Sequence, residues 1–168
     1  MSATIADDRF QVERLIPADS GAIFDVLRSP QGHVAIDSSG MLMSAEGTPT
    51  EAVGDSFVVH MDRDALRDFP LNLYDVTVSI TRFERDRHIE WTILTDFLDP
   101  PVGHVFGYHL QPTDNGTLVT SYYDWSAIAD VYRARLKFPI IPTSSLGATL
   151  GILARTVAPG VPRPVLRA

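Results

Sequence analysis

Four residues that can transfer protons lie on segments whose sequence alternates as a β-strand does. They are two histidines and two aspartates: His60, Asp75, His104 and Asp124. A carboxylate or imidazole that faces an apolar interior has a shifted pKa and could move protons during an aldol-type ring closure. The alternative, which the sequence favours, is that these side chains face solvent or bind backbone groups. They are therefore weak candidates for acid/base catalysis.

The histidines do not form a metal-binding pattern. His104 and His109 are five residues apart on a predicted strand, so their side chains face opposite sides of it. His33 and Asp37 are four residues apart and could meet on a helix, but no third ligand follows at a recognisable spacing. We therefore expect neither a metal site nor a cofactor.

Other catalytic motifs are also missing from the sequence. It contains no cysteine, no Gly-rich phosphate loop, no Walker pattern and no G-x-S-x-G motif, so nothing identifies a nucleophile. Residues 1–8 lack the basic and apolar regions of a signal peptide. Together with the absence of cysteine, this predicts a cytoplasmic protein.

The uncharged segment 138–154 is the one stretch that could be taken for a membrane span. Pro139 and Pro142 interrupt it and hydroxyl residues dilute it, so the sequence predicts a buried helix with its lead-in and no transmembrane segment.

Charge is distributed unevenly along the chain. The net charge of −7 argues against general nucleic-acid binding, which needs a basic face. Every acidic residue lies within the first 130 positions, while the last 38 residues carry six basic side chains. The favoured interpretation is that the C-terminal part complements the acidic body. The alternative is a basic surface that contacts an acidic ligand or an anionic lipid.

The hydrophobic pattern predicts one strand, two short helices, six more strands and one long helix. The first strand covers 10–16, and a helix capped by Asp19 or Ser20 ends at Ser29-Pro30, before a second short helix at 33–36. The later strands are expected at 41–45, 56–61, 74–81, 89–93, 104–110 and 117–126, with a tight Asn115-Gly116 turn before the last.

The final helix is expected to begin near Pro142, with Thr143 or Ser144 as its cap, and to end at Pro159-Gly160. Its apolar stripe consists of Leu146, Leu150, Leu153 and Val157. Gly147 and Gly151 share another face. They would let the helix approach the sheet closely or bend when a ligand enters.

This order, and several short segments within it, resemble the START/Bet v 1-like (SRPBCC) superfamily and its bacterial polyketide cyclase/dehydrase and lipid-transport group. The segments include Ile16-Pro17-Ala18, Gly54-Asp55-Ser56-Phe57, Arg82-Phe83-Glu84, Tyr108-His109-Leu110-Gln111-Pro112 and Asp124-Trp125-Ser126. The resemblance covers roughly residues 9–158 and leaves 1–8 and 159–168 as loose termini.

The resemblance implies an α+β helix-grip fold. In that fold a curved seven-stranded antiparallel sheet, with two short helices after its first strand, wraps around a long C-terminal helix, and a cavity lies between them. Members of the superfamily include lipid carriers, hormone receptors and aromatase/cyclases, so the fold alone assigns no chemistry.

Binding of a small hydrophobic molecule, such as a lipid, fatty acid or polyketide, is the function that the sequence favours. The alternatives are a cyclase/dehydrase-type enzyme, and an interaction domain that contacts its partner through the basic C-terminal segment. A homodimer is left open. Residues expected to line the cavity are apolar or aromatic, with ordinary core packing as the alternative for each: Phe57, Trp91, Phe106, Tyr108, Tyr122, Leu146, Leu150 and Leu153.

Overall fold

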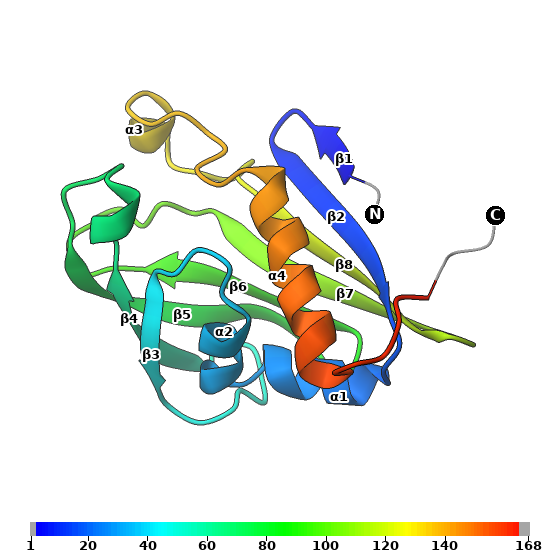
Figure 1. The fold of residues 1–168 in the computed structure, drawn as a ribbon. Helices are drawn as coiled ribbons and strands as arrows, with labels where there is room; N and C mark the ends of the chain where they lie inside the picture. The colour runs from blue at the N-terminus through cyan, green and yellow to red at the C-terminus, as the bar shows by residue number, and fades with distance from the viewer. Residues whose placement is uncertain (1–2, 165–168) are drawn as a thin grey trace.

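One antiparallel sheet of eight strands forms the body of the protein (Figure 1). The computed structural model describes residues 3–164, apart from the side chain of residue 65. The strands are β1 (Ala3–Ala6), β2 (Arg9–Ile16), β3 (Leu42–Glu46), β4 (Ser56–Asp62), β5 (Leu73–Glu84), β6 (His88–Leu94), β7 (Val105–Thr113) and β8 (Gly116–Asp124). Their order across the sheet is β1-β2-β8-β7-β6-β5-β4-β3.

The helical segments are α1 (Ser20–Leu27), α2 (Pro30–Ile36), the single 3-10 turn η1 (Asp64–Leu66), α3 (Asp130–Arg133) and α4 (Thr143–Val157). Helices α1, α2 and α4 pack on one face of this sheet, and two further short helical segments lie in its connections. Helix α4 crosses the sheet and contacts β2 and β8, while α2 contacts β3 and β4 (Figure 1). The predicted α+β arrangement, an antiparallel sheet with a long C-terminal helix across it, is confirmed.

The predicted number of seven strands is wrong, because an eighth strand lies in the segment that was expected to be a loose terminus. Strand β1 pairs with β2 from Ala3↔Val12 to Ala6↔Arg9. All four of its residues are exposed, and Ile5 is its one large apolar side chain. Strand β1 therefore pairs through its backbone at the sheet edge and lacks the alternation of apolar and polar residues by which a half-buried strand is predicted from a sequence.

Two helix starts also differ from the prediction. Ser29-Pro30 does not simply end α1, because Ser29 caps α2 by accepting a hydrogen bond from the backbone N–H of Gly32 at 3.3 Å, and Pro30 is the first helical residue. Helix α4 begins at Thr143, yet the capping position is Pro142 and no side chain caps it.

Strand register separates the side chains of the sheet into two faces. Val12, Ser121 and Tyr108 are aligned across β2, β8 and β7, and they point toward α4, on what we call the inner face. Their neighbours along the strands, such as Gln11 and Tyr122, belong to the outer face. The main core lies between the inner face and the helices, where Leu146, Leu150 and Leu153 of α4 are buried.

The predicted hairpin is present between β7 and β8, but its turn lies one residue earlier, at Asp114 and Asn115, and Gly116 pairs with Thr113 at the start of β8. Gly116 has a φ of 126°, and a Cβ on it would lie 2.2 Å from the carbonyl oxygen of Ile16. Only glycine fits there. Within residues 3–164, no helix has the length and apolar character needed to cross a membrane.

Candidate functional site

Aromatic rings form a continuous wall on the inner face of the middle strands. We define the aromatic wall as Trp91 of β6, Phe106 and Tyr108 of β7, and Tyr123 of β8. The Trp91 ring stacks with Phe106 and Tyr108 at centroid distances of 6.3 and 5.9 Å, and Phe106 stacks with Tyr123 at 4.6 Å. Three predicted lining residues, Trp91, Phe106 and Tyr108, therefore form one apolar surface together with Tyr123, which was not predicted, and this surface spans three strands.

Burial of the inner face falls toward one end of the middle strands. Ile89 on β6 and Leu110 on β7 are fully buried, whereas Trp91 and Phe106 are half-buried. The half-buried end leads into the 95–104 connection, where Phe97 has 51% of its surface exposed. In Figure 1, α1 lies near the other end of these strands, next to the C-terminal end of α4. One part of the aromatic wall is thus left accessible.

His33 brings a polar group to this wall from α2. Its Nε2 donates a hydrogen bond to the Leu27 carbonyl oxygen at 2.8 Å, which fixes the tautomer and leaves Nδ1 as an acceptor. Its ring meets the rings of Phe57 and Trp91 at centroid distances of 4.9 and 4.7 Å. Burial lowers the pKa of His33 to about 4, so the imidazole is neutral near pH 7.

His104 forms a second polar point, in contact with Tyr123. Nδ1 of His104 and the Tyr123 hydroxyl are joined by a hydrogen bond of 3.0 Å. Burial lowers the pKa of His104 to about 4 and raises the pKa of Tyr123. This pair has a neutral imidazole beside a neutral phenol, next to the ring of Phe106.

The predicted lining residues separate into two groups. Seven of the eight lie on the inner face or on α4, in the two apolar clusters beneath the helices: Phe57, Trp91, Phe106, Tyr108, Leu146, Leu150 and Leu153. Tyr122 lies on the outer face, so it cannot contact a molecule held beneath α4. In the Tyr122-Tyr123-Asp124-Trp125 run, the residues directed inward are Tyr123 and Trp125.

Tyr122 is buried on the outer face by polar neighbours. Its hydroxyl donates to Glu90 at 2.7 Å and accepts from Nε2 of His88 at 2.8 Å. Its ring lies directly above Gly107, where a Cβ would come within 2.4 Å of it, and the Arg9 guanidinium covers it at 4.1 Å. These contacts explain how an aromatic ring becomes 99% buried on a face without helices.

The four candidate acid/base residues are not brought together. His104 lies on the inner side, whereas His60 and Asp75 form an outer-face pair at 2.7 Å. Hydrogen bonds from His60 to Asp75 and then to Glu46 raise the pKa of this exposed histidine. Asp124 pairs with Arg9 at 3.5 Å. The structure therefore leaves His104 as the one candidate positioned beside the aromatic wall.

No group of three or more potential metal ligands occurs within the described part of the chain. His33 and Asp37 do not meet, because His33 binds the Leu27 carbonyl and Asp37 accepts hydrogen bonds from Ser39 and Leu42.

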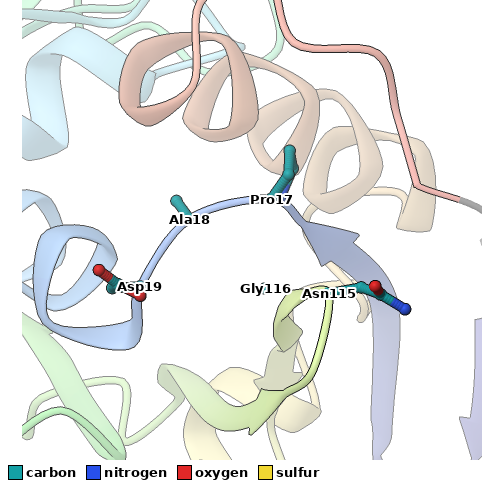
Figure 2. A pocket seen from close by; sticks show the side chains of 5 residues that line it. All are labelled: Pro17, Ala18, Asp19, Asn115 and Gly116. Carbon is teal, nitrogen blue, oxygen red and sulfur yellow. The ribbon is translucent and has the colours of Figure 1, made fainter.

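A shallow pocket occurs where the Pro17-Ala18-Asp19 segment lies against Asn115 and Gly116 of the β7–β8 hairpin (Figure 2). The pocket is open to solvent and includes the Asp19 carboxylate. The Thr117 hydroxyl donates to the Ala18 carbonyl beside it, which ties the two turns together. We assign this pocket to the junction of two turns and place the candidate site at the aromatic wall.

Two residues of the site were not predicted to line it: Tyr123 of the aromatic wall, and His33, which contacts the wall. His33 was considered only as a metal ligand, and the sequence does not tell which face of its strand Tyr123 occupies. For Tyr123 a signal was available, since its position two residues from Ser121 and four from Val119 puts it on the same face as the buried end of β8. For His33 the sequence offers no such signal, because its contacts come from α1, β4 and β6.

Comparison with known proteins gives fold relatives only. No family model matches the chain, and no curated protein is significantly similar to it. The solved structures that are similar include protein Ms6760 from Mycobacterium smegmatis, with a TM-score of 0.67 and 10% identity over 94% of this chain and 96% of that one. They also include ginseng major latex-like protein 151 from Panax ginseng, with a TM-score of 0.63 and 14% identity over 90% of this chain and 97% of that one.

A further neighbour is the AHSA1-like protein from Aeromonas hydrophila, with a TM-score of 0.57 and 17% identity over 89% of this chain and 91% of that one. At these identities the likeness establishes the fold. The chain therefore has the fold of the AHSA1-like protein and of the major latex-like protein, which agrees with the fold that its sequence resemblance predicted.

Proposed function

We propose that this protein binds a small hydrophobic molecule, such as a lipid, a fatty acid or a polyketide, against the aromatic wall beneath α4. The observation that carries the proposal is that the large rings of Trp91 and Phe106 stay half-buried on the inner face, beside core residues that are buried. Large aromatic rings left accessible beside a core are typical of surfaces that bind apolar molecules. Binding would complete their burial, at about 25 cal/mol per Å² of apolar surface removed from water.

The polar groups on the wall suit this role. His33 and His104 are both neutral near pH 7, so neither places a charge next to an apolar ligand. The Nδ1 of His33 provides an acceptor, and Nε2 of His104, the ring nitrogen that does not bind Tyr123, provides a second polar atom. Both could orient a hydroxyl or carbonyl group. A mostly apolar surface with a few placed polar groups is the usual composition of a small-molecule site.

Native mass spectrometry of the purified protein tests the proposal first. The expected result is a co-purifying mass of lipid or polyketide size, and a rise in melting temperature when fatty acids or aromatic polyketides are added. Phe106→Ala should reduce both signals. Phe83→Ala is the matched control, because Phe83 is also a half-buried phenylalanine of the sheet but packs on Phe24 of α1 at 5.2 Å.

The proposal fails if the protein carries no such mass and no compound of either class raises the melting temperature. It also fails if Phe106→Ala and Phe83→Ala reduce ligand retention equally while both variants keep their fold. That result would mean that general destabilisation, rather than loss of the wall, releases the ligand.

A second candidate function, cyclase- or dehydrase-type acid/base catalysis, is favoured by the His104–Tyr123 pair. A neutral imidazole hydrogen-bonded to a phenol could accept or return a proton beside a bound carbonyl compound. Turnover of a polyketide should then be lost in His104→Gln and in Tyr123→Phe. Asp124→Asn is the control on the outer face. If turnover survives the first two substitutions or fails equally in the third, this candidate function is rejected.

Pairing of two copies and a cytoplasmic location stay predictions. One structural neighbour, Aha1 from Colwellia psychrerythraea, was solved as a dimer in solution.

A further inference from the structure

Arg14 differs from the other polar groups of the inner face, because it has no partner among the described residues. It lies on β2 between Val12 and Ile16, whose side chains are buried on the same face. His33, His104 and Tyr123 all have hydrogen-bond partners. Within residues 3–164, no hydrogen bond or ion pair reaches the guanidinium of Arg14, and its Nε is shielded from solvent.

The position of Arg14 is at the seam between β2 and α4. A Cβ built on Gly151 of α4 would lie 3.6 Å from one terminal nitrogen of Arg14, so the guanidinium rests against the helix where the helix has no side chain. Strand β1 pairs with β2 only from Arg9 to Val12, which leaves the backbone of residues 13–16 at the sheet edge. The Arg14 head therefore lies at an open seam, with apolar core on its inner side.

The charged group that acts on Arg14 is another cation, the side chain of Arg163. Arg163, in the exposed segment after α4, repels it, and this repulsion together with burial lowers the pKa of Arg14 from the usual arginine value. Of the five basic residues described after Asp130, only Arg133 forms an ion pair, with Asp8 at 3.3 Å. Complementarity with the acidic body therefore leaves most of this C-terminal basic charge unexplained.

Such an arrangement favours an anion. A half-buried guanidinium without a partner destabilises the ligand-free protein, and an approaching second guanidinium adds to that cost. A carboxylate or phosphate oxygen between them would receive charge-assisted hydrogen bonds from both.

We propose that Arg14, assisted by Arg163, binds the acidic group of an amphiphilic ligand at the seam between β2 and α4. The apolar part of that ligand would lie on the inner face, because the buried cluster runs without interruption from Val12 beside Arg14 to Phe106 and Trp91 of the aromatic wall. This inference rests on the proposed function, and it narrows the ligand to acids with an apolar chain.

Binding of dodecanoic acid, dodecanol and inorganic phosphate to the intact protein tests the inference by calorimetry. A charge-assisted hydrogen bond makes the acid bind about 10- to 100-fold tighter than the alcohol, and this preference should fall as salt is raised. Arg14→Met should bind the acid no better than the alcohol and keep the affinity for the alcohol. Arg87→Met, at an exposed arginine of the β5–β6 turn, is the matched control and should behave as the parent protein does.

The melting temperature of Arg14→Met without ligand distinguishes a binding role of Arg14 from a structural one, because the two roles predict changes of opposite sign. Because Arg14 is an unpartnered half-buried cation, Arg14→Met should raise the melting temperature, whereas a fall would contradict the inference. Equal affinity for acid and alcohol in the parent protein overturns the inference and leaves the proposed function standing. Failure to bind either compound overturns the inference, while the proposed function is decided separately by native mass spectrometry and the melting screen with both compound classes. Phosphate binding as tight as the acid also overturns the inference, since the apolar chain would then contribute nothing.

Discussion

Three buried histidines make the stability of this protein depend on pH. Burial is the main cause that lowers the pKa of His33, His88 and His104 from 6.5 to about 4. A histidine whose pKa is lower in the folded state stabilises the fold fully above its unfolded pKa, and this contribution is lost as pH falls from 6.5 toward 4. At pH 5 each group has lost about 2 kcal/mol, and the three together have lost about 6 kcal/mol. That is a large fraction of the about 5–15 kcal/mol that stabilises a typical domain.

Urea denaturation at pH 7.5 and pH 5.0 measures this loss. In His33→Gln, the difference in unfolding free energy between the two pH values should shrink by about 2 kcal/mol, because the titrating group is gone. The comparison between pH values cancels the loss of stability that the substitution itself causes at both.

His60 provides a control of opposite sign. Its pKa is raised by Asp75 and Glu46, so the stability that it contributes is present at low pH and is lost as pH rises through its folded pKa. His60→Gln should therefore enlarge the loss of stability between pH 7.5 and pH 5.0. The reasoning is refuted if His33→Gln loses as much stability on acidification as the parent protein does.

Other substitutions follow from single contacts. Gly107→Ala places a methyl group against the Tyr122 ring and should lower stability by about 1–3 kcal/mol in a melting experiment; an unchanged melting temperature would show that the ring moves aside freely. Leu150→Ala, at a fully buried position of α4, should lower the free energy of unfolding by about 2–5 kcal/mol. Leu73→Ala, at a leucine with 75% of its surface exposed, should change that free energy by less than about 0.5 kcal/mol, and a similar loss in both variants would contradict the assignment of α4 to the core.

Much of the fold follows from local patterns in the sequence. Alternation of Val76, Val78 and Ile80 indicates one buried face of β5, and the leucine spacing of α4 indicates its buried side. These patterns are visible because packing selects apolar residues at the period of the element. Strand β1 has no such pattern, since its four residues are exposed and only backbone pairing holds them.

The candidate site was less predictable than the fold. Trp91, Phe106 and Tyr108 could be named because large aromatic residues on a strand are enriched in interiors. Tyr122 was expected among the lining residues, although the sequence does not tell which face of its strand points inward. It lies on the outer face, where Arg9 of β2 and His88 and Glu90 of β6 bury it. Such polar burial depends on the pairing of distant strands, which no local pattern reveals.

Tryptophan fluorescence tests most directly the claim that a hydrophobic molecule binds at the aromatic wall. The chain has two tryptophans, the half-buried Trp91 on the wall and the buried Trp125, which packs on Phe10 at 5.7 Å. In Trp125→Phe, where Trp91 is the remaining reporter, titration with dodecanoic acid should shift the emission to shorter wavelength and saturate, as the indole leaves water. In Trp91→Phe the same titration should give little change. An unchanged spectrum in Trp125→Phe, in a protein that calorimetry shows to bind the acid, would place the ligand elsewhere and contradict the central claim.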